Sequence, residues 1–110
     1  MARASLGLVQ GTVDVLILRT LSWADMHGYG IARWISDRSE GALAVEDAAL
    51  YQALHRLERK GFVESAWRTS DKNHRAKYYT ITPQGRRQLK TATAELREYM
   101  GVLFRVLDPT

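Results

Sequence analysis

The chain has 110 residues, of which 45% are hydrophobic and 25% charged, and its formal net charge at pH 7 is +4. This length predicts one small domain with a single modest core. The absence of cysteine excludes a disulfide framework, a thiolate zinc site and a cysteine nucleophile. The sequence contains no recognisable signal peptide or membrane-spanning run, so we expect a cytoplasmic protein that has no membrane partner.

Two helices are predicted in the first third of the chain. The first begins after Thr12, a predicted N-cap, and is apolar over much of its circumference. Such a helix is buried on more than one side, and we expect its Leu16 to contact a partner subunit. The second helix is predicted over residues 29–38, where apolar side chains recur at helical spacing.

The stretch LYQALHRLER, residues 50–59, predicts a short helix with two unlike faces. At about 100° per residue, its three leucines stack on one side, as in a helix that packs on a core. The other side carries small, amide, imidazole and guanidinium groups, which can enter a DNA major groove and hydrogen-bond to base edges. An ordinary amphipathic helix with a solvated polar face is the alternative. The residues of that side are Ala48, Gln52, His55 and Arg59, with Tyr51 and Arg56 on the flanks and Lys60 directly after the helix.

A two-stranded wing is predicted directly after this helix. We expect Gly61 to end the helix, since glycine enters the left-handed region without a Cβ penalty. Residues 62–67 alternate as a strand does, and residues 77–82 are rich in β-branched and aromatic side chains. A basic, polar loop joins the two strands. We expect the wing tip to carry basic groups to phosphates or into the neighbouring minor groove; these are Lys72, His74 and Arg75.

Basic charge is concentrated on the predicted helix and wing. Residues 52–90 contain ten Lys or Arg and three acidic residues, a net charge of +7, so the rest of the chain has a net charge of −3. Concentrated positive charge of this kind favours binding to a polyanion such as nucleic acid. A generic solvated basic surface would explain the composition alone, but here the charge coincides with the predicted motif.

A long helix is predicted from Pro83 to about Val106. Thr82 is its predicted N-cap, and the proline occupies the first helical position. Apolar residues recur every seven positions along it, as in a coiled-coil seam. We expect two copies of the chain to pair through this seam, which places two recognition helices in successive major grooves; packing on the helix's own domain alone is the alternative. The predicted dimerisation residues are Leu16, Leu89, Leu96, Met100 and Leu103.

Together these elements predict a mainly α fold with a small two-stranded β-wing. A winged helix-turn-helix domain over residues 1–82 and a dimerisation helix over residues 83–110 would form one compact unit. Sequence-specific binding to double-stranded DNA is the favoured function, and a nonspecific architectural nucleic-acid-binding protein is the alternative. That alternative calls for exposed aromatic side chains among basic ones, whereas we expect Trp23, Trp34 and Trp67 to lie in the core or in dimer contacts. An adaptor that only dimerises would leave the basic segment unexplained.

The sequence predicts neither an enzyme nor a cofactor or metal site. It contains no nucleophile and base at a suitable spacing, no phosphate-binding loop and no paired carboxylates with an evident role. His27, His55 and His74 do not form a ligand pair on one helix face. We therefore expect a protein that is not an enzyme and that binds no cofactor and no metal ion.

The sequence resembles the PadR family of bacterial transcriptional regulators, in particular the short subfamily with a single C-terminal helix. The resemblance covers nearly the whole chain, from about residue 11 to residue 103. Gln52 stands where the family usually has proline, and its amide is able to pair with adenine. The matching motifs are GYGI at 28–31, LYQALHRLE at 50–58, GFV at 61–63, RAKYY at 75–79 and TPQGR at 82–86.

The resemblance implies a dimeric winged helix-turn-helix repressor that binds a two-fold symmetric operator. It implies that Tyr51 contacts the phosphate backbone. It also implies a small hydrophobic or aromatic effector, which some members hold on a tryptophan of the last helix. This chain has only Tyr99 and Phe104 as aromatic residues there, which leaves the effector open. The positions that match the groove-facing set are Ala48, Gln52, His55 and Arg56, and those that match the wing are Lys72, Asn73, His74, Arg75 and Lys77.

Overall fold

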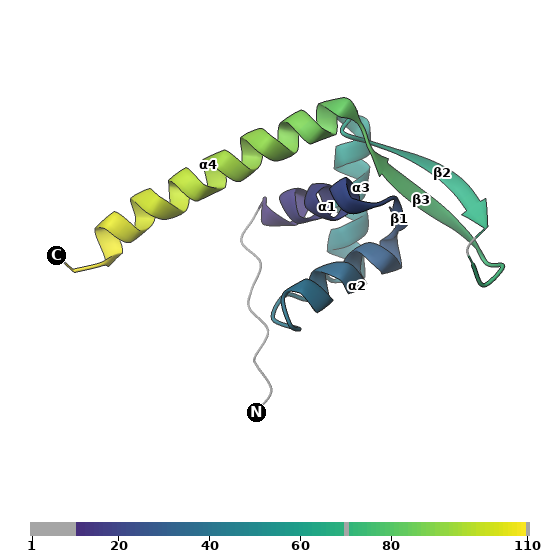
Figure 1. Cartoon of the computed structure of the whole chain (residues 1–110), viewed down its shortest axis with the longest axis horizontal. Helices are drawn as coiled ribbons and strands as arrows, with labels where there is room; N and C mark the ends of the chain where they lie inside the picture. Colours follow the sequence, from purple (N-terminus) through teal and green to yellow (C-terminus); the bar gives the residue numbers. More distant parts are fainter. Residues whose placement is uncertain (1–10, 70, 110) are drawn as a thin grey trace.

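The structure is a computed structural model that describes residues 11–69 and 71–109. Figure 1 shows a group of helices beside a small sheet, with the long C-terminal helix projecting away from them. The predicted mainly α fold with a β-wing and a long C-terminal helix is confirmed. The described elements follow the order α1 (Thr12–Trp23), β1 (Met26–His27), α2 (Gly28–Arg38), α3 (Asp47–Arg59), β2 (Val63–Thr69), β3 (Arg75–Ile81) and α4 (Pro83–Leu107).

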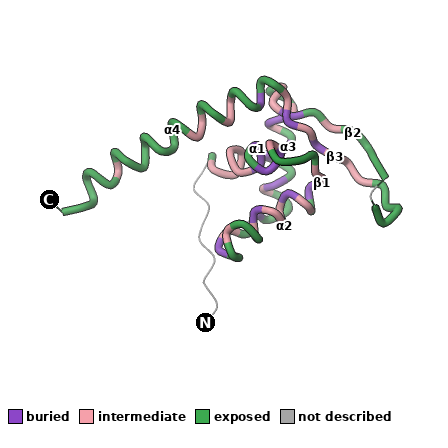
Figure 2. The backbone as a smooth tube through the Cα atoms, in the orientation of Figure 1, coloured by how far each residue is buried: buried purple, intermediate pink, exposed green. Residues whose placement is uncertain are grey.

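The hydrophobic core lies where α1, α2 and α3 meet the inner end of the sheet. The three leucines predicted to face the core, Leu50, Leu54 and Leu57, are at most 2% exposed. They belong to one buried cluster with side chains of α1 and α2, such as Ile17 and Ile31. Figure 2 shows this concentration of buried residues. Each such side chain contributes roughly 1.5–3 kcal/mol when buried, so one side of α3 is firmly fixed and the other is left exposed.

The end of α3 is set by glycine, as the sequence predicts. Gly61 has a φ of 78°, a left-handed conformation that a Cβ would disfavour. Its N–H donates to the carbonyl oxygen of Glu58 at 3.0 Å, and the N–H of Phe62 donates to the carbonyl oxygen of Leu57 at 2.9 Å. These two bonds form a Schellman motif, which turns the chain from α3 directly into the wing.

The sheet has three antiparallel strands in the order β1-β3-β2, rather than the two predicted. The strands β2 and β3 have seven residues each and pair along their full length, so they extend farther toward the loop than predicted. The missed strand, β1, consists of Met26 and His27, which pair with Tyr79 and Tyr78 of β3. A two-residue strand has no alternation for a sequence pattern to reveal. It attaches the connection between α1 and α2 to the wing.

The two predicted helix caps have different outcomes. Thr82 caps α4 as predicted: its Oγ1 accepts a hydrogen bond from the N–H of Gly85 at 3.0 Å, and Pro83 stands at the start of the helix. The prediction that Thr12 caps α1 is wrong. Thr12 is the first residue of the helix, and Gly11 is the N-cap with a φ of 88°. That left-handed φ suits glycine and is unfavourable for most other residues, so the helix begins one residue earlier than threonine capping requires.

Within residues 11–69 and 71–109, only the first part of α4 packs on the other elements. Gly85 is buried there, and a Cβ at this position would clash with the carbonyl oxygen of Phe62. Leu89 is partly buried and packs against the core cluster. From residue 94 onward almost every described side chain of the helix is exposed, and Figures 1 and 2 show this part extending clear of the other elements.

Candidate nucleic-acid interface

The exposed side of α3 carries the residues predicted to read DNA. Six of them line one shallow groove of about 590 Å³. Because the leucines behind them are buried, the backbone beneath this surface is held in place. Lys60 is exposed and follows as the C-cap residue of the helix. We name this surface the α3 face, and its residues are Ala48, Tyr51, Gln52, His55, Arg56 and Arg59.

One member of the α3 face is held by an ion pair. Nη2 of Arg56 donates to Oδ1 of Asp14 at 2.7 Å, and Nε donates to Oδ2 at the longer distance of 3.5 Å. The hydrogen bond with Asp14 raises the pKa of the Arg56 guanidinium above its ordinary value. The two residues are 42 positions apart in the chain, so no local sequence pattern indicates that they meet. The pair connects the first turn of α1 to the edge of the α3 face.

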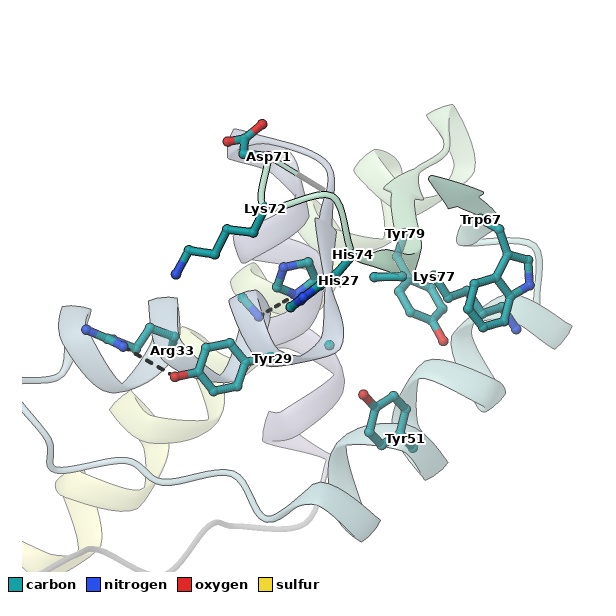
Figure 3. Close-up of a pocket in the computed structure, with 13 residues that line it drawn as sticks. His27, Tyr29, Arg33, Tyr51, Trp67, Asp71, Lys72, His74, Lys77 and Tyr79 are labelled. Carbon is teal, nitrogen blue, oxygen red and sulfur yellow. Dashed lines mark hydrogen bonds between the residues drawn. The ribbon is translucent and has the colours of Figure 1, made fainter. Parts of the chain in front are cut away.

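Tyr51 lies over the beginning of α2. A Cβ built on Gly28 would be 2.5 Å from the Tyr51 Oη, so the ring can lie this close only because the residue beneath it is glycine. Figure 3 shows the Tyr51 hydroxyl pointing from α3 toward the space below the wing. Tyr51 therefore joins the α3 face to a second hollow, which lies between α2 and the sheet.

That hollow is a cleft of about 1010 Å³ lined by basic and aromatic side chains. Figure 3 shows Arg33 and Tyr29 on the α2 side and Lys72 on the wing side. Nη1 of Arg33 donates to the Tyr29 hydroxyl at 3.4 Å, and this hydrogen bond raises the pKa of Arg33. Tyr29 and Arg33 were not predicted as site residues, because neither belongs to the predicted recognition helix or wing.

The wing presents its basic residues next to aromatic rings. The Arg75 guanidinium lies 5.6 Å from the centre of the Trp67 ring, within the range of a cation–π contact. Trp67 is 60% exposed, so it does not lie in the core of its own chain, and its role in dimer contacts stays a prediction. It is on the same side of β2 as the buried Val63, but it lies beyond the point where the core ends. Trp23 is also exposed, whereas Trp34 packs partly against the core.

The loop at the wing tip is exposed. Lys72, Asn73 and His74 lie there, and Asn73 adopts a left-handed φ of 60°, which asparagine tolerates better than most residues. Lys77 lies further along β3, with its Nζ 5.9 Å from the centre of the Tyr79 ring. All five predicted wing residues are therefore on one arm of the molecule, beside the cleft or at its tip.

Two contacts attach this arm to the helices. Arg68 donates to Oδ2 of Asp25, which precedes β1, at 3.0 Å. The Nδ1 atom of His27 accepts a hydrogen bond from the N–H of Gly30 at 3.0 Å and caps α2. The sheet and the start of α2 are therefore linked, which fixes the wing relative to the α3 face.

The predicted dimerisation residues fall into two groups. Leu16 and Leu89 are partly buried and pack against the core of their own chain. Leu96 and Met100 are exposed, and Leu103 is partly exposed, on the projecting part of α4. Leu96, Met100 and Leu103 therefore have apolar surface available for another molecule, whereas Leu16 and Leu89 have little exposed apolar surface.

None of the helices in residues 11–69 and 71–109 is long and apolar enough to cross a membrane. In the same residues, no three or more His, Asp or Glu side chains are grouped so that they could hold a metal ion.

Known proteins are similar to this chain in sequence and in fold. The sequence model of the transcriptional regulator PadR-like family matches residues 17–91. The chain belongs to the PadR family. The resemblance of the sequence to this family is therefore confirmed.

Several relatives cover most of the chain. A PadR family transcription regulator from Clostridium difficile is 32% identical, with 88% of this chain and 99% of that chain covered and a TM-score of 0.75. A transcriptional regulator from Clostridium thermocellum is 31% identical over 87% of this chain and 93% of that chain, with a TM-score of 0.80. An uncharacterized protein from Lysinibacillus sphaericus is 30% identical over 96 residues, which are 87% of this chain and 88% of its own.

Proposed function

We propose that this PadR-family protein is a sequence-specific DNA-binding repressor that reads a two-fold symmetric operator as a homodimer. The α3 face carries the proposal. Its amide, imidazole and guanidinium groups are exposed together on a helix whose other side is buried. A helix of this kind fits a major groove, where side chains reach the base edges. The protein would act on DNA in the cytoplasm.

Within the α3 face the side chains have different tasks. The Gln52 amide can pair with adenine through one donor and one acceptor. Arg59 is exposed at the other end of the face and can reach a guanine or a phosphate. Ala48 has a side chain small enough to let the start of the helix approach the bases closely. Base preference therefore rests on a few groups.

The wing and the cleft supply contacts that do not depend on sequence. Lys72 and Arg75 are exposed on the wing, where their charge can displace counterions from phosphates. The Tyr51 hydroxyl faces the cleft and is placed to donate to a phosphate oxygen. Contacts of this kind position the protein on the duplex and make its affinity depend on salt.

A dimer formed through the projecting part of α4 is supported by the apolar surface exposed there. Besides Leu96 and Met100, the exposed side chains include Tyr99, Val102 and Phe104. Apolar side chains exposed in numbers on one part of a soluble protein often mark an interaction site. The heptad spacing of the seam matches a second copy of the same helix, which would place the two α3 faces about one turn of DNA apart.

We further propose that a small hydrophobic or aromatic effector binds the protein. Tyr99 and Phe104 are exposed on α4, and pairing of two helices would bring rings from both copies to the same region. Planar aromatic compounds that release bound DNA from the wild-type protein, but not from Tyr99→Ala, would support this site. Equal release from both proteins would place the effector elsewhere.

One observation favours the architectural alternative. The exposed ring of Trp67 under Arg75 is the combination of an aromatic and a basic group that single-stranded nucleic acids bind. Such a protein would show no sequence preference and would bind single strands at least as well as duplexes.

Selection from a random pool of duplex DNA, followed by salt titration of the winners, separates the two functions. The proposed regulator enriches one two-fold symmetric sequence, and its affinity for that sequence exceeds its affinity for a scrambled duplex by about 10³ or more. Salt-sensitive binding without enrichment supports the architectural alternative. An absence of binding at low salt contradicts both.

A further inference from the structure

The two arginines of the α3 face stand in different surroundings. Arg56 is held by Asp14, with its side chain 42% exposed and that of Asp14 22% exposed. Arg59 is exposed and forms no ion pair with any residue in the described part of the chain. The Arg56 guanidinium is therefore held in one orientation by Asp14, whereas no ion pair in the described residues restrains the Arg59 guanidinium.

The geometry of the pair leaves part of the Arg56 guanidinium available. A guanidinium has five N–H donors in a rigid plane. Asp14 is contacted by the edge that carries Nε and Nη2, so Nη1 and the second hydrogen of Nη2 are directed elsewhere. A pair of hydrogens on Nη1 and Nη2 is suited to the O6 and N7 acceptors of guanine. The carboxylate thus fixes the plane of the fork without occupying the end needed for a base.

Asp14 is itself well placed to hold that plane. It lies in the first turn of α1, and the next turn of that helix is fixed in the core by Ile17 and Leu18. The carboxylate therefore belongs to a rigid part of the molecule rather than to a loop. It also offsets the charge of Arg56, which weakens any attraction of this side chain to phosphates in general.

We propose that Asp14 is a positioning residue, which holds Arg56 in the orientation for one base pair and keeps it from contributing to sequence-independent binding. This inference rests on the proposed function and adds a residue outside the recognition helix to the determinants of specificity. Holding the side chain before DNA arrives removes part of the entropy cost of ordering it at the base. Asp14 then controls the ratio of specific to nonspecific affinity more than it controls affinity itself.

Asp14→Asn tests the proposal, because it removes the charge and keeps the size of the side chain. The measurement is the affinity of the full chain for its selected duplex and for a scrambled duplex over a range of salt concentrations. We expect the ratio of the two affinities to fall roughly tenfold. We also expect the salt slope on the scrambled duplex to steepen by about one unit, because Arg56 is released to a phosphate. In an Arg56→Ala background, Asp14→Asn should leave the ratio unchanged within about twofold.

Asp25→Asn is the matched control. It breaks the ion pair between Asp25 and Arg68, whose N–O distance is 3.0 Å and whose side chains are similarly exposed, but which lies outside the α3 face. The contacts of the wing do not depend on sequence, so any shift of the wing changes both affinities alike, and we expect the affinity ratio to stay unchanged within about twofold.

Arg56→Lys is a second variant that tests the proposal if Asp14→Asn does not fold. Lysine keeps the charge but lacks the planar fork, so it should lower the ratio as Asp14→Asn does, without changing α1. An unchanged ratio in both Asp14→Asn and Arg56→Lys, with only the melting temperature lowered, would overturn the proposal and leave the pair as a structural contact. Failure of the wild-type chain to prefer any duplex would instead contradict the proposed function itself.

Discussion

The winged-helix body and the projecting part of α4 bury their apolar side chains to opposite extents. In the body, the leucines of α3 are enclosed by α1, α2 and the sheet, and polar groups occupy the outside. Along the projecting part, Tyr99, Met100 and Phe104 are exposed. The body buries its apolar side chains in its own core, whereas this part of α4 leaves its apolar side chains exposed, as a surface that binds a partner does. Under the proposed function, the body would read DNA and the projecting part of α4 would pair two copies, so a substitution could affect one task without the other.

The largest effect is expected where the two regions join. Gly85→Ala places a methyl group against the carbonyl oxygen of Phe62, which backbone atoms cannot easily avoid, and we expect a loss of roughly 3 kcal/mol in the free energy of unfolding. Gly101→Ala is the matched control on the same helix, because a Cβ there meets nothing within 4 Å. It should stabilise the helix by roughly 0.5–1 kcal/mol. Thermal and urea unfolding measure both, and equal effects would mean that α4 is not anchored at Gly85.

The next effect separates pairing from folding. Met100→Glu introduces a charge on the proposed seam at a side chain that is exposed in the single chain. We expect the dimer to weaken at least about 100-fold, with little change in the melting temperature extrapolated to low protein concentration. Thr91→Glu adds the same charge to an exposed position on the opposite side of α4 and should leave the dimer intact. Sedimentation velocity distinguishes them, and equal dissociation constants would show that the seam is not the interface.

A third comparison lies within the body, between the α3 face and the wing. Gln52→Ala should cost roughly 1–3 kcal/mol on the selected duplex and relax the preference at one or two base pairs. Lys72→Ala should weaken binding about equally on all duplexes and make the salt slope shallower by about one unit. Anisotropy titrations on selected and scrambled duplexes measure both quantities. If the two variants change base preference and salt slope alike, the α3 face and the wing do not have the separate roles proposed for them.

The smallest effect concerns the close approach of Tyr51 to α2. Gly28→Ala displaces the end of the Tyr51 ring, which is a mobile group rather than backbone, so stability should change by less than about 1 kcal/mol. Affinity should fall roughly threefold on every duplex, because a phosphate contact supplies affinity rather than preference. Tyr51→Phe is the companion variant, and Gly28→Ala should add little in that background. A changed base preference in Gly28→Ala would show that Tyr51 reads bases.

Periodic and capping patterns were sufficient to predict most of the fold. The leucine stripe of α3, the glycine after it and the Thr82–Pro83 start of α4 each depend on neighbouring residues in the chain, so their signals are local. The strand β1 was not predictable in this way. It is defined by its pairing with Tyr78 and Tyr79 of β3, which only the folded chain brings beside it.

The same distinction applies to the candidate site. The polar side of α3 could be listed from helical spacing, because its residues share one helix. The ion pair between Asp14 and Arg56 and the cleft beside Arg33 depend on elements that are distant in sequence. The exposure of Trp67 depends on where the core stops along β2, which alternation alone does not reveal. The features that could not be predicted from the sequence therefore all depend on tertiary structure.

The number of protein copies bound to a selected operator tests the central claim most directly. Native mass measurement of the complex is made on the full two-fold symmetric duplex and on a duplex that carries one half-site. The account predicts two copies on the full site, bound in a single step, and much weaker binding to the half-site. One copy on the full site, or a number of copies that grows with duplex length, would contradict a dimer that reads a symmetric operator.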